Sequence, residues 1–188
     1  MKSKFATKLL SLLLVVCTIM SIAAVPASAV STGSITESKT ATIKYLGRME
    51  ILKKTGGTSM GASSWSYTTN TGITGTGYCV NWGLNMVSAS KALTLQEYNR
   101  NPQTMGAFAN GYPMRTLEQF KQLHSSDVRG VANLTEAEYE YATQVAVWAT
   151  CGQIAVPGTK FTSGRSSIIV PTSDAQQIRV YDSLVAIL

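Results

Sequence analysis

Two side chains in this sequence have the reactivity for covalent chemistry, a cysteine and a glutamine that lie far apart in the chain. Cys79 lies between Tyr78 and Trp82 in an apolar and aromatic segment, where a cysteine is usually an inert small hydrophobe or half of a disulfide. Gln144 lies in Tyr141–Trp148, where apolar residues nearly all round the predicted helix indicate burial. A buried primary amide with an unpaired oxygen or nitrogen costs roughly 1–3 kcal/mol. Gln144 is therefore either hydrogen-bonded to neighbouring backbone or consumed in a reaction.

Three separated motifs occur in one order along the chain. They are the aromatic-cysteine segment at Cys79, the turn Asn110-Gly111-Tyr112-Pro113, and Thr143-Gln144-Val145-Ala146 followed by Trp148. From about Ala41 to its end, the chain resembles the thioester domain of Gram-positive bacterial surface adhesins, a family also named for its T-Q-x-A motif. The resemblance implies that Cys79 and Gln144 form an intramolecular thioester. It further implies covalent attachment through that bond to amines, such as lysine side chains, on a host or surface target.

The residue types suit this chemistry. A thiol held against a side-chain carboxamide can attack it and expel ammonia, because fixed proximity replaces a bimolecular encounter. The resulting thioester is useful only if water is kept away, which requires an apolar, aromatic wall. The candidates for that wall are Tyr78, Trp82, Tyr112, Tyr141 and Trp148, and each of them can equally be an ordinary core aromatic. Attack by a lysine amine on Gln144 releases the Cys79 thiol, so the coupling is a single-turnover event rather than enzymatic catalysis, and it requires no cofactor.

A second cysteine offers a different partner for Cys79. Cys151 lies seven residues after Gln144, which places both on nearly the same face of a continuous helix, two turns apart. Of the three cysteines in the sequence, Cys17 lies in an N-terminal segment with the features of a signal peptide, so the exported chain keeps an even pair, which first suggests one disulfide. A Cys79–Cys151 disulfide would preclude the thioester and leave a non-covalent ligand-binding module.

A cysteine hydrolase is a third reading. Cys79 precedes the chain's single histidine, His124, and Asp127 follows three residues later, so the order Cys, His, Asp is present. The segment around His124 is typical of an exposed helix end, where a histidine is solvated. One histidine and two separated cysteines do not make a zinc site, and no glycine-rich stretch matches a phosphate-binding loop.

The sequence patterns around Cys79 and Gln144 predict strands and helices that together form an α+β domain. A β-rich subdomain, with strands from about 41–84 and 160–171, packs against a helical subdomain of about 85–150, and a C-terminal helix follows. Residues 41–52 predict one or two strands, and the Gly/Ser/Thr-rich stretch 55–77 predicts loops and short strands. The segment 78–83 predicts a short buried strand that carries Cys79.

Amphipathic spacing and capping residues predict the helices. Apolar residues three and four apart indicate helices over 93–99 and 116–123. The clearest helix covers 134–149, with Thr135 and Glu138 as a capping box, acidic residues including Glu140 that complement the helix dipole, and Gly152 as its stop. Residues 161–170 have strand-like composition. A last helix over 174–187 begins with a second capping signature, Ser173 and Gln176.

The N-terminal residues indicate export. Three lysines precede an apolar run that is too short for a membrane span and ends in Ala27-Ser28-Ala29, which predicts a signal peptide over 1–29 with cleavage after Ala29. An alternative is a lipoprotein signal ending at Cys17, although Val16 fits that motif poorly. Residues 30–40 predict a flexible leader, and 41–188 form the expected thioester domain.

Charge and length set two further expectations. Removal of the three signal-peptide lysines lowers the net charge of the 188-residue chain from +6 to +3, and the remainder holds no basic cluster that suggests nucleic acid. Adhesins of the resembled family usually continue into stalk domains and a cell-wall sorting signal, whereas this sequence ends at Leu188. A freely secreted form and a fragment are both compatible with that ending.

Overall fold

The computed structural model describes residues 40–82, 91–94, 101–164, 166–168 and 173–188. The expected signal peptide, and the expected leader except for its last residue, lie outside the described residues. In the part that is described, no helix combines the length and the apolar character needed to cross a lipid bilayer.

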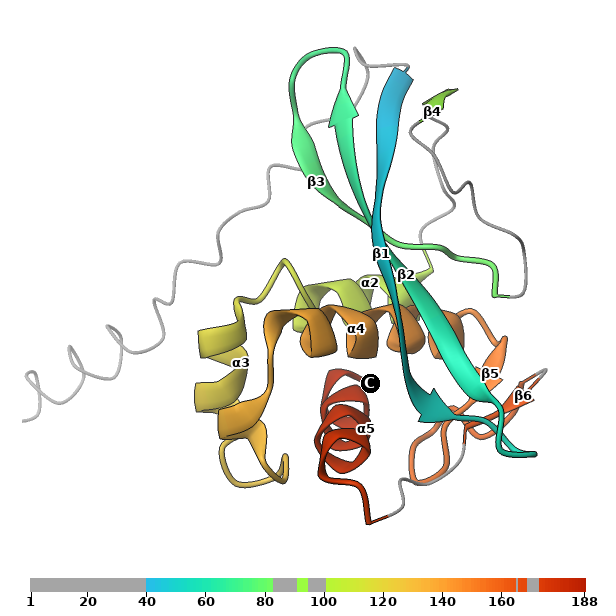
Figure 1. Cartoon of the computed structure of the whole chain (residues 1–188), viewed down its shortest axis with the longest axis vertical. Helices are drawn as coiled ribbons and strands as arrows, with labels where there is room; N and C mark the ends of the chain where they lie inside the picture. The colour runs from blue at the N-terminus through green and yellow to red at the C-terminus, as the bar shows by residue number, and fades with distance from the viewer. Residues whose placement is uncertain (1–39, 83–90, 95–100, 165, 169–172) are drawn as a thin grey trace, which may run out of the picture. The chain divides into compact units, whose positions relative to one another are not determined.

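A four-stranded antiparallel sheet forms the first half of the described chain, in the order β3-β2-β1-β4 (Figure 1). The strands are β1 Thr40–Lys53, β2 Ser59–Thr69, β3 Thr74–Gly77 and β4 Lys91–Thr94. The turn between β1 and β2 contains Gly56 and Gly57 at φ of 95° and 81°, a left-handed conformation that glycine adopts without steric cost. A register shift between Tyr45 and Gly47 interrupts the pairing of β1 with β2.

The expectation of loops and short strands over 55–77 is wrong for β2, which is a continuous strand of 11 residues. Its buried side chains do not follow one alternation: Met60 and Ala62 are buried, but the next buried residue is Trp65, opposite the shift in β1. The many small polar residues of β2 also have weak intrinsic strand preference. Pairing with β1, rather than local pattern, therefore determines this strand.

The second half of the chain is mainly helical. The helices are α2 Pro102–Asn110, α3 Leu117–Leu123, α4 Glu136–Thr150 and α5 Ala175–Ile187, with a 3₁₀ turn at Val131–Asn133. Two short parallel strands, β5 Ile154–Ala155 and β6 Ser166–Ser167, lie between α4 and α5. Helix α4 contacts α2, α5 and β2, and α5 also contacts β1 (Figure 1). The predicted α+β organisation, including the C-terminal helix, is confirmed.

Local capping residues start the helices largely as expected. Both side-chain and backbone hydrogen bonds of the Thr135–Glu138 capping box are present. Helix α4 ends at Thr150, with Cys151 as its C-cap and Gly152 next at φ 70°. A second complete box, Thr116 with Gln119, starts α3. The N-cap of α5 is Asp174, whose side chain accepts a hydrogen bond from the backbone N–H of Gln177, so the predicted Ser173 signature is wrong by one residue.

Three further expectations are wrong. Residues 78–82 form no strand, and Leu93 and Thr94 belong to β4 rather than to a helix, while 95–99 lie outside the described residues. Of the described residues in the expected strand over 161–170, which exclude 165, 169 and 170, only Ser166 and Ser167 form a strand, with one isolated bridge between Ile168 and Lys54. Helix α2 was not predicted from the sequence. Its start signal is nevertheless present there, because Asn101 is the N-cap and Pro102 is the first helical residue.

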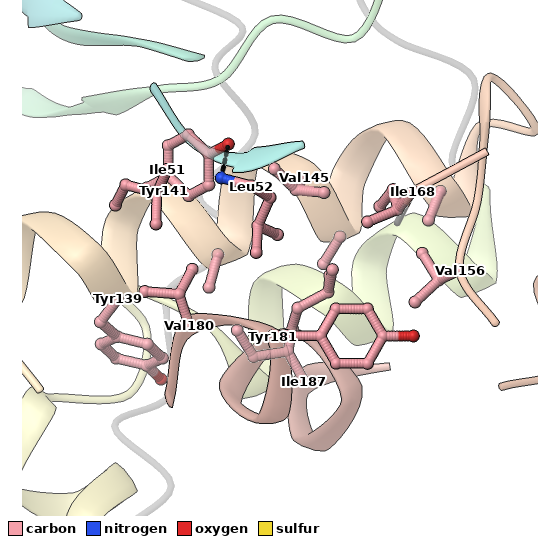
Figure 2. Packing of buried hydrophobic residues seen from close by; sticks show 14 of the residues in the cluster. Ile51, Leu52, Tyr139, Tyr141, Val145, Val156, Ile168, Val180, Tyr181 and Ile187 are labelled. Carbon is pink, nitrogen blue, oxygen red and sulfur yellow. Dashed lines mark hydrogen bonds between the residues drawn. The ribbon is translucent and has the colours of Figure 1, made fainter. Parts of the chain in front are cut away.

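The hydrophobic core lies where α4 meets the sheet and α5 (Figure 2). Tyr141 links α4 to two strands, because its hydroxyl donates to the carbonyl oxygen of Met60 at 2.7 Å and accepts from the backbone N–H of Leu52 at 3.1 Å. Glu138, which is buried, and Arg179, which is half-buried, join α4 to α5 through an ion pair with an N–O distance of 2.6 Å. These links fix α4 in place, and α4 carries Gln144.

Candidate functional site

The side-chain amide of Gln144 binds the backbone of Cys79 on both sides. The Cys79 N–H donates to Oε1 of Gln144 at 2.7 Å, and Nε2 of Gln144 donates to the carbonyl oxygen of Cys79 at 2.8 Å. Gln144 is 2% exposed, so the amide is held in a site from which water is almost excluded. The two residues lie 65 positions apart in sequence, and the structure brings them together as expected.

The sulfur of Cys79 lies next to this pairing. In the structure the half-buried thiol donates to the carbonyl oxygen of Asn81 at 3.2 Å. Rotation about the Cα–Cβ bond of Cys79 redirects the sulfur without disturbing the two backbone hydrogen bonds to Gln144. The backbone N–H at Oε1 also sits where negative charge would develop during attack on the amide carbon, as in an oxyanion hole.

A second glutamine, which the sequence reasoning missed, holds the residues after Cys79. The side chain of Gln153 donates to the carbonyl oxygen of Val80 and accepts from the backbone N–H of Trp82. The backbone of residues 79–82 thus pairs with two side-chain amides instead of with a neighbouring strand, which explains why the expected strand is absent. Apart from the presence of an amide side chain, the sequence carries no local signal for this role, because the partners of Gln153 lie 71 and 73 residues away.

Thr143, next to Gln144, positions the turn at residues 110–113. Its hydroxyl donates to the carbonyl oxygen of Tyr139 at 2.9 Å and accepts from the backbone N–H of Tyr112 at 3.0 Å. The approach requires glycine at 111, because a Cβ there would lie 2.4 Å from Cγ2 of Thr143. Tyr78 then donates its hydroxyl to the carbonyl oxygen of Tyr112 at 2.5 Å, which ties the residue before Cys79 to the same turn.

A pocket of about 250 Å³ opens beside Gln144, between β1, β2 and α4. Its polar wall includes Glu140, one helical turn before Gln144, whose Oε1 accepts a hydrogen bond from the Ser64 hydroxyl at 2.5 Å. Partial burial raises the pKa of Glu140, the negative charge of Glu136 raises it further, and the Ser64 hydrogen bond opposes the rise. Sequence reasoning assigned Glu140 only to the helix dipole, since its contact with Ser64 spans 76 residues.

Comparison with known families identifies this arrangement. The family model described as thioester domain matches residues 76–186, a range that contains both Cys79 and Gln144. The chain belongs to the thioester domain family. No curated protein and no solved structure matches it. Strands β1 and β2 precede the matched range, so the sheet wall of the pocket lies outside what the family model describes.

Two of the predicted wall aromatics of the thioester domain, Tyr78 and Tyr112, contact each other beside Cys79. The ring of Tyr78 packs against Phe108, and burial, followed by the negative charge of Glu140, raises the pKa of its phenol above the ordinary value. Tyr112 donates its hydroxyl to Glu136 at 2.5 Å, and this hydrogen bond, with burial, raises its pKa to about 12. Both tyrosines are therefore neutral hydrogen-bond donors at physiological pH.

The other three predicted wall aromatics occupy different surroundings. Tyr141 lines the pocket together with Gln144, and burial raises its pKa to about 12. Trp82 is half-buried, and Lys54 Nζ lies 5.0 Å from its ring centroid. Trp148 is 4% exposed and belongs to the core cluster. Their role in shielding the thioester remains a prediction.

The structure separates the two cysteines of the thioester domain. Both are free thiols, so the expected alternative of a Cys79–Cys151 disulfide is not formed. Helix α4 ends before Cys151, which caps it and whose sulfur lies 3.6 Å from the hydroxyl oxygen of Thr104. Cys79 instead contacts Gln144, on the preceding turns of α4.

His124 and Asp127 form a pair, but their described contacts do not include Cys79. Nδ1 of His124 lies 2.9 Å from Oδ2 of Asp127, and the ring packs on Phe120 with centroids 4.6 Å apart. The imidazole follows α3 as expected, but its side chain is only 13% exposed, so the expectation of a solvated histidine is wrong. Among the described residues, no group of three or more His, Cys, Asp or Glu side chains could hold a metal ion.

Proposed function

We propose that Cys79 and Gln144 form an internal thioester that couples the protein covalently to an amine. The observation that carries this proposal is the pairing of the Gln144 amide with both backbone groups of Cys79, at 2.7 and 2.8 Å. Membership of the thioester domain family supports it. The pairing holds the amide in one orientation against the backbone of the residue that carries the thiol, which lowers the entropy cost of bringing the two groups together.

The bond-forming step balances without a cofactor. The Cys79 sulfur attacks Cδ of Gln144, the Cys79 N–H stabilises the charge on Oε1, and the C–N bond breaks. The nitrogen leaves as ammonia after taking the proton that the thiol loses, so the products are a thioester and one ammonia. A lysine amine then attacks the same carbon, forms an amide bond to the target, and returns Cys79 to a thiol. The protein is thus consumed in a single coupling, unlike an enzyme.

The biological setting belongs to the same proposal. The signal peptide over residues 1–29 directs the chain out of a Gram-positive cell, and the thioester domain attaches as an adhesin to amine-bearing proteins on a host or surface. Fractionation of a producing culture, with the N-terminus of the exported protein determined by mass spectrometry, tests the cleavage after Ala29. Retention of residues 1–29 in the exported protein would contradict this part of the proposal.

Intact-mass analysis tests the thioester directly. We expect the wild-type protein to be lighter by one ammonia than its sequence, and to gain one methylamine when incubated with that amine. Peptide mapping should place the methylamine on Gln144 and show Cys79 newly available to an alkylating reagent. Cys79→Ala and Gln144→Ala should each abolish the deficit and the addition.

Cys151→Ala provides the matched cysteine control. Since Cys151 contacts Thr104 rather than Gln144, this variant should keep both the mass deficit and the methylamine addition. A wild-type protein at full sequence mass, or one lighter by only the two hydrogens of a disulfide, would overturn the proposal.

A further inference from the structure

The pocket beside Gln144 has the features of a site for one side chain. We name it the α4 pocket; its lining residues on α4 are Ala137, Glu140, Tyr141 and Gln144, and β1 and β2 supply the opposite wall. Its volume of about 250 Å³ is below the range of roughly 300–1,000 Å³ that is typical of sites for larger small molecules. A single amino-acid side chain is an occupant of the appropriate size.

The walls of the α4 pocket combine apolar surface with one acidic group near the reacting amide. Leu46, Met49 and Ala62 contribute apolar side chains from the strands. Glu140 contributes the carboxyl group and lies four residues before Gln144, which places the two side chains on the same face of α4. Arg48, the basic residue of the lining, pairs with Glu50 at 2.8 Å.

The chemistry of coupling explains why a carboxylate is useful there. A lysine side chain in water carries an ammonium group, which has no lone pair and cannot attack a thioester until it loses a proton. An apolar pocket suits the methylene stem of lysine, and a carboxylate at its inner wall attracts the ammonium head. Both features occur in the α4 pocket.

We propose that the α4 pocket receives the lysine side chain of the target and that Glu140 accepts a proton from its ammonium group. This inference rests on the proposed function. The neutral amine then attacks Cδ of Gln144, and the C–S bond to Cys79 breaks as the amide bond forms. The departing sulfur takes the second proton from the attacking nitrogen, and Glu140 releases the first to solvent.

The surroundings of Glu140 support this role. The Ser64 hydroxyl fixes one carboxyl oxygen, at 2.5 Å, so the side chain is held in position before an amine enters. Burial raises the pKa of Glu140 above the ordinary glutamate value, which makes the carboxylate a better proton acceptor near neutral pH. Glu136, Tyr78 and Tyr112 interact electrostatically with Glu140 and do not neutralise its charge. The cation of the pocket lining, Arg48, is paired with Glu50.

Two nucleophiles of different charge test the inference on the full exported chain carrying the thioester. N-α-acetyl-lysine enters as an ammonium ion, whereas hydroxylamine is neutral at pH 7 and needs no prior deprotonation. In Glu140→Gln, which retains an acceptor for Ser64, we expect the second-order rate constant for acetyl-lysine to fall about 100-fold, as is typical for loss of a general base. The rate constant for hydroxylamine should change by less than about threefold, and Glu140→Asp should restore part of the lysine rate.

The controls separate this role from a structural one. Glu118→Gln removes the same charge from exposed α3 and should leave both rates unchanged. Equal slowing with both nucleophiles, or an unchanged lysine rate in Glu140→Gln, would overturn the inference while the mass deficit of the wild type still supports the thioester. A wild-type protein without that deficit would overturn the proposed function and this inference with it.

A second variant decides the matter if Glu140→Gln fails to form the thioester. Ala137 lines the α4 pocket from an exposed position on α4, so Ala137→Phe narrows the pocket with little cost to the fold. We expect the rate constant for acetyl-lysine to fall at least tenfold more than the rate constant for hydroxylamine. A tenfold change corresponds to about 1.4 kcal/mol. An unchanged ratio of the two rates would show that lysine enters elsewhere.

Discussion

Gln144 and Gln153 bind the same short segment of backbone with their side-chain amides. Gln144 pairs with the N–H and C=O groups of Cys79, and Gln153 pairs with the C=O of Val80 and the N–H of Trp82. The segment that carries the nucleophile is therefore positioned by two glutamines from α4 and the turn that follows it. In the proposed reaction Gln144 is the partner of Cys79, whereas the two hydrogen bonds of Gln153 hold the segment in place.

Gln153→Ala should slow thioester formation without abolishing it. The substitution removes two hydrogen bonds to residues 80 and 82, each worth about 0.5–1.5 kcal/mol, and lets the Cys79 segment depart from the reactive geometry. The measurement is the fraction of protein with the ammonia deficit as a function of time after refolding, together with the free energy of unfolding. Gln122→Ala, on the exposed surface of α3, is the matched control. Formation at the wild-type rate in Gln153→Ala would contradict the positioning role.

Cys79→Ala should lower the free energy of unfolding by about 4 kcal/mol. A covalent link across 65 residues restricts the unfolded chain, and the loop-entropy relation for disulfides gives this magnitude if it holds for a thioester. The variant retains the intact Gln144 amide with both backbone hydrogen bonds, whereas the thioester has lost Nε2 and its hydrogen bond, so the measured loss is a lower bound on the effect of the link. Denaturant unfolding provides the measurement, with Cys151→Ala as reference. Small and equal losses in the two variants would count against a covalent bond.

Thr143→Val should destabilise the turn that carries Tyr112. Valine has nearly the shape of threonine, but it leaves the Tyr112 N–H without its acceptor in a buried site, at a cost of about 1–3 kcal/mol. Because Tyr78 binds the carbonyl oxygen of Tyr112, methylamine should also react at a changed rate. Thr143→Ser keeps the hydroxyl and should lose only about 0.8 kcal/mol for the methyl group. If Thr143→Ser changes the unfolding free energy and the methylamine rate as much as Thr143→Val does, the lost hydrogen bonds are not the cause of these changes.

Glu138→Gln should lower the free energy of unfolding at neutral pH, and this loss should be smaller in acid. Burial acts to raise the pKa of Glu138, but hydrogen bonds from Arg179, Thr135 and Gln176 outweigh it and lower the pKa below the ordinary value. The ionised group therefore stabilises the fold above the unfolded-state pKa of about 4.3, and this contribution disappears as pH falls through the lower folded-state pKa. Because Arg179 is only partly buried and remains accessible to water, removal of its partner should cost about 1–3 kcal/mol.

Unfolding free energies of wild type and Glu138→Gln between pH 7 and pH 3 check this expectation. The difference between them should be constant near neutrality and shrink below about pH 4. Glu118→Gln, which removes an exposed carboxylate paired only loosely with Lys121 at 4.0 Å, should show little difference at any pH. If the difference in unfolding free energy between wild type and Glu138→Gln grew in acid, the pKa of Glu138 would be raised in the folded state rather than lowered.

Local signals in the sequence predicted the helices that carry the site. Thr135 and Glu138 satisfy backbone groups within one turn of each other, and Gly152 stops the same helix, so α4 is recognisable from neighbouring residues alone. The order of the motifs around Cys79, Tyr112 and Gln144 was sufficient for the family, which the match over residues 76–186 confirms. The outcome for α5 was similar, apart from the one-residue error at its N-cap.

Only the tertiary structure decided how the reactive segment is held and what surrounds it. Strand β2 exists because β1 pairs with it, and the backbone around Cys79 is no strand because Gln144 and Gln153 occupy its hydrogen-bonding groups. Ser64 and Glu140 meet across 76 residues, a contact that no local pattern encodes. The physical reason is the same in each case: capping and helical periodicity act within a few residues, whereas these hydrogen bonds form only after the chain has packed α4 against the sheet.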